Sequence, residues 1–428
     1  MERILEHFRV ITAIPRCSFN AEAMRLHIKT FAHAVGCDVV EDEFGNVLCR
    51  KGNPRVCLQA HYDMVCIGDV QSIEIKQENG CLKAKNSTLG ADNGIGMAMM
   101  FCAMEEHEDI ECLFTADEEV GLIGAMQFRV PLQSSYLINL DAEEEGEIYI
   151  GCAGGVDVVA SMLLEQTPLD SAYNVYAIEA KDFLGGHSGV DIDKNIPSAI
   201  KALAYELSLH KACVLVSFEG GERRNAIPRN AKAIIAIPHE MTLCDERLSL
   251  HKLENTHSYQ GLVQSSAVIK ALAGFAQGVR AWDKTLGIPS VSINIGVISQ
   301  NNAILRIDCA ARAMDDTALT VLAHETEMYF QGLGFSTVQE GFHSAWKPEM
   351  GALAHLVKES MQDIYPQAIV KAIHAGLECG ELISHQPKKI EAVSIGPTIR
   401  YPHSLREECE LDSIERMSKI VKKLITTL

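Results

Sequence analysis

The chain has 428 residues, and its 57 acidic side chains exceed its 38 lysines and arginines, giving a formal net charge of −19. This length predicts two or three domains, and a hydrophobic fraction of 47% excludes wholesale disorder. The acidic balance argues against a duplex nucleic-acid partner, which requires a cationic surface.

Targeting and membrane signals are not found in the sequence. No stretch approaches the roughly 20 uncharged apolar residues of a membrane-spanning helix. The first residues, MERILEHFRVITAIPRCS, are typical of an amphipathic helix and not of a signal peptide. The 14 cysteines are scattered and form no CxxC pair. We therefore expect reduced, mostly buried thiols in a cytoplasmic protein with no membrane partner.

The first 155 residues alternate strand-like and helix-like segments. Strands are predicted at 55–60, 111–116 and 136–141, and a helix at 91–106. Strands separated by helices indicate βαβ units and a mostly parallel sheet.

The pattern changes between 156 and 339, where short αββ units recur. Strands are predicted there at 174–182, 213–221, 225–238, 289–299 and 302–313, and helices at 196–209, 265–282 and 316–335. After 340 the first pattern returns, with a helix at 350–365, strands at 368–374 and 390–396, and a C-terminal helix. The fold class is therefore α/β: one domain with a central, mostly parallel sheet from 1–155 and 340–428, and an inserted α+β domain at 156–339.

Polar residues that can bind metals follow the strands of the α/β part. His61 and Asp63 follow the first strand, Asp117, Glu118 and Glu119 the second, and Asp141 the third, while a loop after the last strand leads to His403. Because ligands bind at the carboxyl ends of parallel strands, we expect these side chains to meet at one edge of the sheet.

Two imidazoles and several carboxylates form a mixed nitrogen and oxygen set, which suits zinc, manganese or cobalt better than calcium. Asp92 lies in GADNG (90–94), a glycine-flanked turn before a helix, where a short carboxylate can bridge two metals. Two-metal sites of this kind occur in hydrolases. In the Glu118-Glu119 pair, one residue can act as a ligand and the other as the base that activates water.

Each motif also has a simpler interpretation. An HxD at a strand end can be a loop or a core pair, DEE a solvated turn, and a single Asp a helix cap. GADNGIG can be only a tight turn, and it lacks the lysine of a P-loop. Their occurrence in one order, each after an apolar strand, favours the metal site.

HYD (61–63), GADNG (90–94), DEEVG (117–121), NLD (139–141) and a late histidine resemble the metal-site motifs of the dinuclear-zinc exopeptidases. Further motifs resemble the bacterial aminoacyl-histidine dipeptidases of that superfamily: HAGLECG (374–380), SIGPTI (394–399), GGHSG (185–189) and RNAIPR (224–229). The resemblance covers nearly the whole chain.

The resemblance implies a residue-by-residue assignment of the metal site. His61 and Asp141 bind one ion and Glu119 and His403 the other, while Asp92 bridges both and its bond to Asn93 is cis. Asp63 orients His61, and Glu118 is the general base. The cofactors are two divalent ions, zinc first, with manganese or cobalt as alternatives.

The resemblance also implies that the inserted domain is a lid and dimerisation domain. His187 helps to hold the substrate and the oxyanion, Asn225 and Arg312 bind the substrate carboxylate, and Glu378 lies near the substrate's amino end. A homodimer is expected.

The implied function is a metallodipeptidase that hydrolyses unblocked dipeptides and favours C-terminal histidine. A deacylase, desuccinylase or tripeptidase of the same superfamily is the nearest alternative. Two others are a metal-free binding relative, against which the complete set of ligand positions argues, and a two-metal phosphohydrolase.

Overall fold

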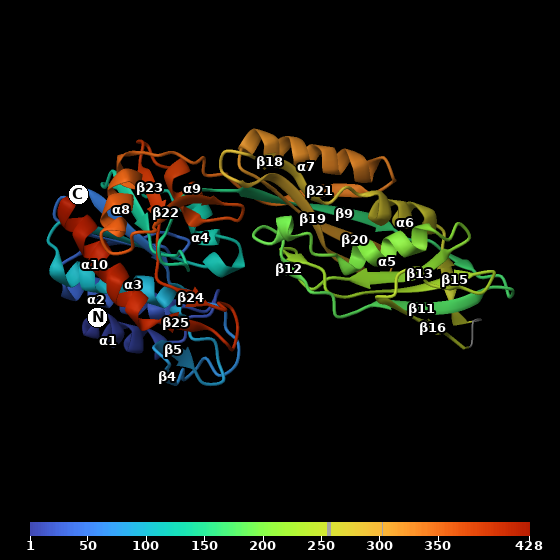
Figure 1. Ribbon diagram of the computed structural model, residues 1–428, viewed down its shortest axis with the longest axis horizontal. Helices are drawn as coiled ribbons and strands as arrows, with labels where there is room; N and C mark the ends of the chain where they lie inside the picture. The colour runs from blue at the N-terminus through green and yellow to red at the C-terminus, as the bar shows by residue number, and fades with distance from the viewer. Residues whose placement is uncertain (255–257, 302) are drawn as a thin grey trace. The chain divides into compact units, whose positions relative to one another are not determined.

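A computed structural model describes residues 1–254, 258–301 and 303–428. The chain folds as two compact units, each described here by itself (Figure 1). The first unit comprises Met1–Cys152, Trp346–Ala372 and Leu377–Leu428, and the second comprises Ala153–Ala345 and Ile373–Gly376. The predicted strand at 302–313 begins at a residue outside the described part of the chain.

The first unit is built on an eight-stranded sheet in the order β1-β2-β6-β3-β7-β23-β8-β22. Its centre is parallel: β3 (Val56–His61) pairs with β6 (Ile110–Thr115) and β7 (Tyr136–Asn139), and β7 pairs with β23 (Glu391–Ser394). The pairs β1–β2, β2–β6 and β23–β8 are antiparallel. These outer strands are β1 (Asp38–Glu41), β2 (Val47–Lys51), β8 (Glu147–Cys152) and β22 (Ile369–Ile373). The predicted mostly parallel central sheet is confirmed.

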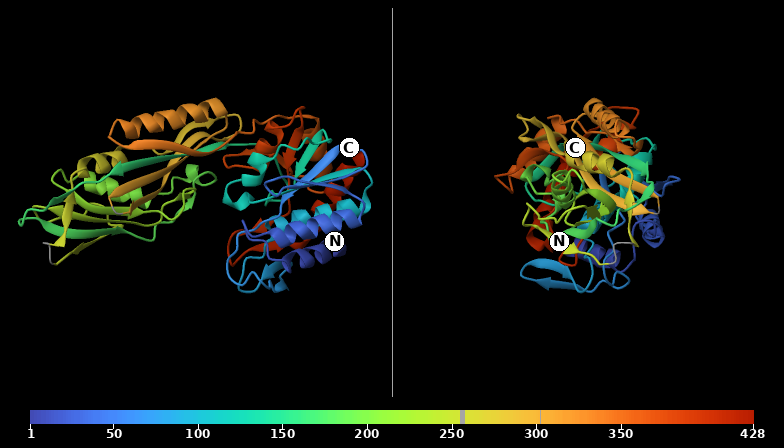
Figure 2. Two further views of the ribbon diagram at one scale, coloured as in Figure 1. Left: turned by 180° about the vertical axis from the view of Figure 1, so that it is seen from behind. Right: turned by 90° about the vertical axis from the view of Figure 1, so that its right-hand side faces the viewer.

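Helices cover this sheet because their apolar residues need a partner surface. The helix α3 is almost wholly buried, which explains its run of methionines. It packs against α1, and α2 packs against β1 and β2; Figure 2 shows these two N-terminal helices in blue. The helices are α1 (Glu2–Thr12), α2 (Glu22–Ala34), α3 (Ala91–Glu106), α4 (Ile123–Gln127), α8 (Ala352–Gln362), α9 (Glu378–Ser384) and α10 (Leu411–Thr427), with the 3₁₀ turn η1 (Glu118–Val120).

A small antiparallel sheet completes the first unit, in the order β24-β25-β5-β4. Its strands are β4 (Ile75–Glu78), β5 (Cys81–Ala84), β24 (Ile399–Arg400) and β25 (Glu408–Glu410). The loop between β24 and β25 carries His403, so this sheet fixes both ends of that loop.

The second unit is an antiparallel sheet in the order β16-β11-β15-β13-β19-β20-β9-β21, with β18 paired to β19, and three helices pack on it (Figure 1). The strands are β9 (Gly154–Leu163), β11 (Asn174–Ala180), β13 (Val214–Gly220), β15 (Ala231–Ile237), β16 (Leu248–Lys252), β18 (Gly278–Asp283), β19 (Ile288–Asn301), β20 (Ile304–Ala313) and β21 (Ser336–His343). The helices are α5 (Ala199–Ser208), α6 (Ser265–Gly274) and α7 (Asp316–Gln331), with the 3₁₀ turn η2 (Ile192–Lys194). Two short ladders join β10 (Gln166–Pro168) to β17 (Gln260–Leu262) and β12 (Gly186–His187) to β14 (Ala226–Ile227).

Three sequence expectations about this unit differ from the structure. The single strand predicted at 225–238 is divided into β14 and β15, which belong to different sheets. The predicted helix at 265–282 ends at Gly274, and Gly278–Asp283 form a strand. Phe275 is extended and Gly278 has a φ of 99°, so the helix cannot continue. Residues Ile373–Gly376, assigned to the α/β part, belong to the second unit, because the Ala153 N–H donates to the Ile373 carbonyl at 3.0 Å and His374 Nε2 lies 2.7 Å from Ser292 Oγ.

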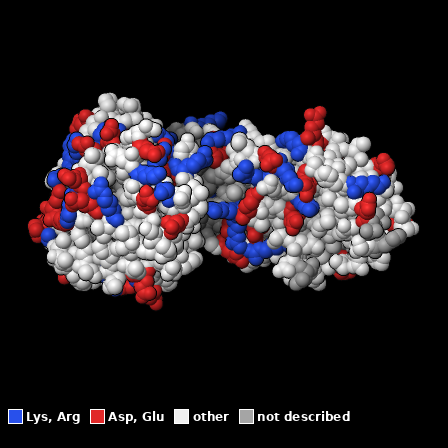
Figure 3. Space-filling view, turned by 90° about the horizontal axis from the view of Figure 1, so that it is seen from below, with Lys and Arg blue, Asp and Glu red and all other residues white. Residues whose placement is uncertain are grey.

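The expectation that all cysteines are reduced is wrong for one pair. Cys17 and Cys66 form a disulfide between Cα atoms 5.5 Å apart. Most of the other cysteines are buried free thiols, as predicted. No helix in the described residues is long and apolar enough to cross a bilayer. Acidic and basic side chains are interspersed on the face shown in Figure 3.

Candidate metal centre and active site

The carboxyl ends of the central strands carry the predicted site residues. His61 is the last residue of β3, and Asp63 follows it in the next loop. The turn η1 after β6 carries Glu118 and Glu119. Asp141 comes two residues after the end of β7. Asp92 lies in the first turn of α3, and His403 lies in the loop after β24.

These side chains form two groups that share Asp92. Its Oδ1 lies 3.0 Å from His61 Nε2, which is also 3.2 Å from Asp141 Oδ1. Its Oδ2 lies 3.0 Å from His403 Nε2, which is also 2.8 Å from Glu119 Oε2. In each group of three, one donor atom from every residue lies within 4.8 Å of the others. Asp92 therefore presents one oxygen to each group.

The backbone around Asp92 is held by its neighbours. The Asp92–Asn93 peptide bond is cis, and the Asn93 side-chain amide donates to Asp141. Gly90 has a φ of 68°, a conformation that favours glycine. A Cβ on Gly96 would lie 2.0 Å from Asn93 Oδ1, so a side chain there would displace Asn93. The glycines of GADNGIG therefore allow the close packing that places Asp92.

Asp63 connects His61 to the two glutamates. Its carboxylate accepts the N–H groups of Glu118 at 3.0 Å and Glu119 at 3.3 Å, and the Ser18 hydroxyl at 2.7 Å. Its Oδ1 also lies 3.5 Å from His61 Nδ1. Asp63 thus fixes the start of η1, the turn that presents both glutamates, and faces the ring of His61.

The electrostatics of the cluster favour a positive charge at its centre. Burial alone lowers the pKa of His61, but Asp141, Asp63 and Asp92 raise it well above its ordinary value. Burial likewise opposes the charge on His403, yet Asp92 and Glu119 raise its pKa to about 11. Burial raises the pKa of Asp141 to about 6 and that of Glu118 well above its usual range. The carboxylates repel one another and attract any cation placed between them.

This donor set fits two divalent cations. Each group offers one imidazole nitrogen and at least two carboxylate oxygens, which are ligands of zinc, manganese and cobalt. In the described part of the chain, the buried Glu119 Oε1 has no hydrogen-bond partner. An unsatisfied buried carboxylate oxygen is costly, and a metal ion would satisfy it.

Glu378 lies beside the candidate metal centre, since His61 and Asp141 are among the groups that affect its pKa. It begins α9 and is 0% exposed, and its Oε2 accepts from Gln59 Nε2 at 2.5 Å and from Thr115 Oγ1 at 2.9 Å. Burial raises its pKa to about 7. Its other oxygen, Oε1, is buried without a hydrogen-bond partner in the described part of the chain. The role near the substrate's amino end stays a prediction.

Sequence reasoning missed three charged residues beside the site. Burial, with Asp92 and Asp141, raises the pKa of Glu143 to about 8. Arg16 and Glu407 are buried against the backbone of the ligand loops. Glu143 was detectable, because it follows Asp141 by two residues. The other two gave no signal, since their contacts are with backbone atoms far away in the sequence.

The second unit brings together His187, Arg312 and His374. His187 Nδ1 accepts the N–H groups of Gly189 at 3.2 Å and Val190 at 3.1 Å, so its ring proton is on Nε2. A Cβ on Gly189 would lie 3.1 Å from His187 Cε1 and 3.2 Å from Arg312 Nε, which places those side chains side by side. Burial, with Arg312 and His187, lowers the pKa of His374 to about 3.

The backbone of Asn225 lies next to His187 through a short ladder, although Asn225 is 87 positions from Arg312. The Asn225 carbonyl accepts the Ser188 N–H at 2.8 Å, and His187 pairs with Ala226 in the β12–β14 ladder. Asn294 on β19 donates to the Ala226 carbonyl at 2.8 Å, and Arg312 on β20 pairs with Ser292 of the same strand. Sequence separation therefore does not keep Asn225 away from the arginine.

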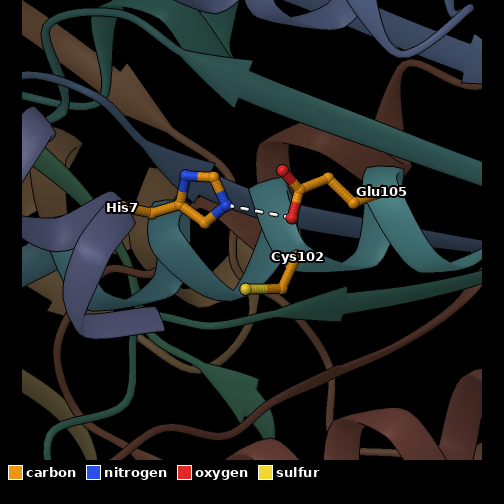
Figure 4. A group of neighbouring side chains, drawn as sticks. All are labelled: His7, Cys102 and Glu105. Carbon is orange, nitrogen blue, oxygen red and sulfur yellow. Dashed lines mark hydrogen bonds and ion pairs between the residues drawn. The ribbon is translucent and has the colours of Figure 1, made fainter. Parts of the chain in front are cut away.

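His61, Glu118 and Glu119 also form a group of metal-capable residues in the same centre. A separate group, His7, Cys102 and Glu105, lies between α1 and α3 (Figure 4). His7 Nε2 is 3.2 Å from Glu105 Oε2, but both oxygens of Glu105 also pair with the Arg3 guanidinium. Burial raises the pKa of Cys102 to about 12, so the sulfur stays a thiol. We interpret this group as an ion-pair network that joins the two helices.

The comparisons with known proteins agree with this geometry. The family model described as peptidase family M20/M25/M40 matches residues 57–427. The chain belongs to this peptidase family. It is therefore a peptide hydrolase, as the sequence motifs predicted, and the fold expected from the resemblance is confirmed.

Full-length relatives of this peptidase are known. It is 31% identical to the cytosol non-specific dipeptidase of Escherichia coli (strain K12), over 98% of this chain and 96% of that protein. It is also similar to the crystal structure of aminoacylhistidine dipeptidase from Vibrio alginolyticus, with a TM-score of 0.79, 29% identity and coverage of 98% and 96% of the two chains. A tripeptidase from Staphylococcus aureus, at 17% identity and a TM-score of 0.59 over 100% and 98% of the two chains, shares the fold.

Proposed function

We propose that this peptidase is a dipeptidase that hydrolyses unblocked dipeptides, with preference for C-terminal histidine, and uses two divalent cations. The observation that carries the proposal is the sharing of Asp92 between two ligand groups, with Glu118 next to both. The names of the two full-length relatives support a dipeptide substrate, and that of the Vibrio alginolyticus protein supports histidine as the second residue.

In this proposal the side chains of the first unit have three roles: metal binding, proton transfer and positioning of the base. When bound, the two ions supply Lewis-acid activation of water and of the scissile carbonyl. His61 and Asp141 would hold one ion, Glu119 and His403 the other, and Asp92 would contribute to both. Glu118 takes the proton from the attacking water and delivers it to the leaving amine. Asp63 keeps Glu118 in place through the backbone of η1.

The polar residues of the second unit bind the ends of the substrate in this proposal. His187 carries its proton on Nε2 and so can donate to an oxyanion or a carboxylate. Arg312 offers a bidentate fork for the substrate carboxylate, and Asn225 an amide. We further propose that zinc is the physiological metal, with manganese or cobalt as substitutes, and that the enzyme is a cytoplasmic homodimer.

A substrate panel tests the proposal. β-Ala-His, Gly-His, Leu-Leu, an N-acetylated dipeptide and a succinylated amine are incubated with the purified protein, with zinc or manganese and with chelator. Chelator-sensitive cleavage of the unblocked dipeptides, fastest for those ending in histidine, is the expected result. Cleavage of the blocked compounds alone would assign the chain to the deacylases, and equal rates for Leu-Leu and Gly-His would refute the histidine preference.

A further inference from the structure

Two buried residues of opposite charge lie against the segment that carries Asp92. Arg16 is 1% exposed and Glu407 is 3% exposed. Neither is among the metal-binding groups. They come from opposite ends of the chain, and Asp92 contributes to the electrostatic environment of both. Burying two charges is costly unless each is fully hydrogen-bonded, so their partners indicate what they do.

Glu407 binds the amide side of this segment. Its Oε2 accepts the N–H groups of Leu89 at 2.8 Å and Gly90 at 3.0 Å. Its Oε1 accepts those of Ala91 at 2.8 Å and Asp92 at 3.3 Å. One carboxylate thus receives four consecutive backbone donors that end at the shared metal ligand. Glu407 also lies four residues after His403, so its fixation limits the movement of that ligand's loop.

Arg16 binds carbonyl groups of the same segment and of the neighbouring ligand loop. One guanidinium nitrogen, Nη1, donates to the carbonyls of Tyr62 at 3.1 Å and Asp63 at 2.6 Å, and Nη2 donates to that of Gly90 at 2.5 Å. These bonds join the loop after His61 to the turn before Asp92. The planar guanidinium, with several donors in a fixed arrangement, reaches carbonyls of two loops at once.

The glycines of GADNG make room for the guanidinium. A Cβ on Gly90 would lie 2.6 Å from Arg16 Nη2, and a Cβ on Gly94 would lie 2.9 Å from the same atom. The motif is therefore matched to a buried arginine 74 positions before Gly90. Guanidinium and carboxylate bind the carbonyl and amide groups of one short segment, so each complements the local peptide dipoles.

We propose that Arg16 and Glu407 are positioning residues that hold Asp92, His61 and His403 in the geometry that binds two metal ions. The inference rests on the proposed function for its catalytic consequence, but its direct consequence is metal affinity. Residues that orient ligands typically contribute about 10–100-fold to metal affinity or activity. Removing either charge should therefore weaken metal binding without removing a ligand.

The test measures Zn²⁺ affinity of the full-length apoprotein by competition with a chromophoric chelator, without peptide. Glu407→Gln keeps the size of the side chain but places an NH₂ group against backbone N–H donors. We expect its Zn²⁺ affinity to fall by about 10–100-fold for at least one ion. We also expect kcat to fall with KM nearly unchanged, and excess Zn²⁺ to restore part of the activity.

The matched control is Glu111→Gln. Glu111 is also a fully buried carboxylate, and it accepts the N–H groups of Gln133 and Ser134 and the Arg50 guanidinium, but no metal-ligand loop. The Glu111→Gln variant should be less stable than the unaltered protein and bind Zn²⁺ with the same affinity. Equal Zn²⁺ affinity in Glu407→Gln, Glu111→Gln and the unaltered protein would overturn the proposal.

A second variant, Arg16→Lys, keeps the positive charge and removes the fork. If Glu407→Gln does not fold, Arg16→Lys is the deciding variant. A weakened Zn²⁺ affinity in Arg16→Lys supports the positioning role, and an unchanged affinity refutes it. Because affinity is measured without substrate, failure of the dipeptide panel would refute the proposed function and leave this test intact.

Discussion

At the scale of single residues, the site depends on how neighbouring carboxylates are given different tasks. Glu118 and Glu119 are adjacent in the 3₁₀ turn η1, and Asp63 binds the backbone N–H of both. Only Glu119 lies within 2.8 Å of His403 Nε2. A carboxylate oxygen of Glu118 also lies within 4.8 Å of donor atoms of His61 and Glu119. The contact with His403 supports our proposal that Glu119 is the ligand and Glu118 the base.

Glu118→Gln tests this division. The amide cannot accept the proton of water, so kcat should fall by about 10²–10⁴-fold, the usual contribution of a general base. The metal content, measured by atomic emission, should stay at the level of the unaltered protein. A variant with full activity would remove Glu118 from the role of base.

His403→Ala tests the second ligand group. His403 Nε2 faces both Asp92 and Glu119, so its removal should cost about one ion per chain and leave the group of His61 and Asp141 intact. His355→Ala, on α8 of the same unit, is the control. Unchanged metal stoichiometry in His403→Ala would exclude His403 as a ligand.

At the scale of elements, the disulfide joins two segments that contact the metal-site loops. Arg16 and Ser18, on either side of Cys17, bind the Asp63 carbonyl and carboxylate, and Cys66 ends the stretch that follows Asp63. The bond links residues 49 positions apart. The loop-entropy model assigns about 4 kcal/mol to a loop of this length.

Replacing both residues, in Cys17→Ser with Cys66→Ser, should therefore lower the free energy of unfolding by up to about 4 kcal/mol under oxidising conditions. With a reductant present, the variant and the unaltered protein should unfold at nearly the same denaturant concentration. If the unaltered protein has the same unfolding midpoint with and without reductant, the disulfide does not form.

The strands of the second unit hold a buried neutral imidazole. The pKa of His374 is lowered to about 3 by burial, Arg312 and His187, whereas an unfolded histidine titrates near 6.5. Between these values the unfolded chain binds a proton that the folded chain does not. The contribution of the neutral His374 side chain to the stability of the folded protein is therefore complete above about pH 6.5. This contribution is lost progressively as the pH falls toward 3.

His374→Gln should reduce this pH dependence, since an amide can still face Ser292 but does not titrate. The measurement is the free energy of unfolding from pH 7 to pH 4 for both proteins. A slope in the variant equal to that of the unaltered protein would contradict the depressed pKa.

At the scale of the whole molecule, periodicity predicted the central sheet, and the strand-end residues predicted which metal-capable side chains gather at its edge, because parallel strands end at one edge. Contacts that depend on tertiary structure could not be predicted. Arg16 and Glu407 bind backbone atoms, which no side-chain pattern records. The pairing of Cys17 with Cys66 among 14 cysteines, and the strand after Gly278, also depend on distant partners.

The central claim is that two metal ions sharing Asp92 make this chain a dipeptidase. The most direct measurement is a titration of the apoprotein with Zn²⁺ while the hydrolysis of Gly-His is followed. The account predicts that activity rises to a plateau at two ions per chain, and that Asp92→Asn abolishes this rise. Hydrolysis by the metal-free protein, or a plateau at one ion, would contradict it.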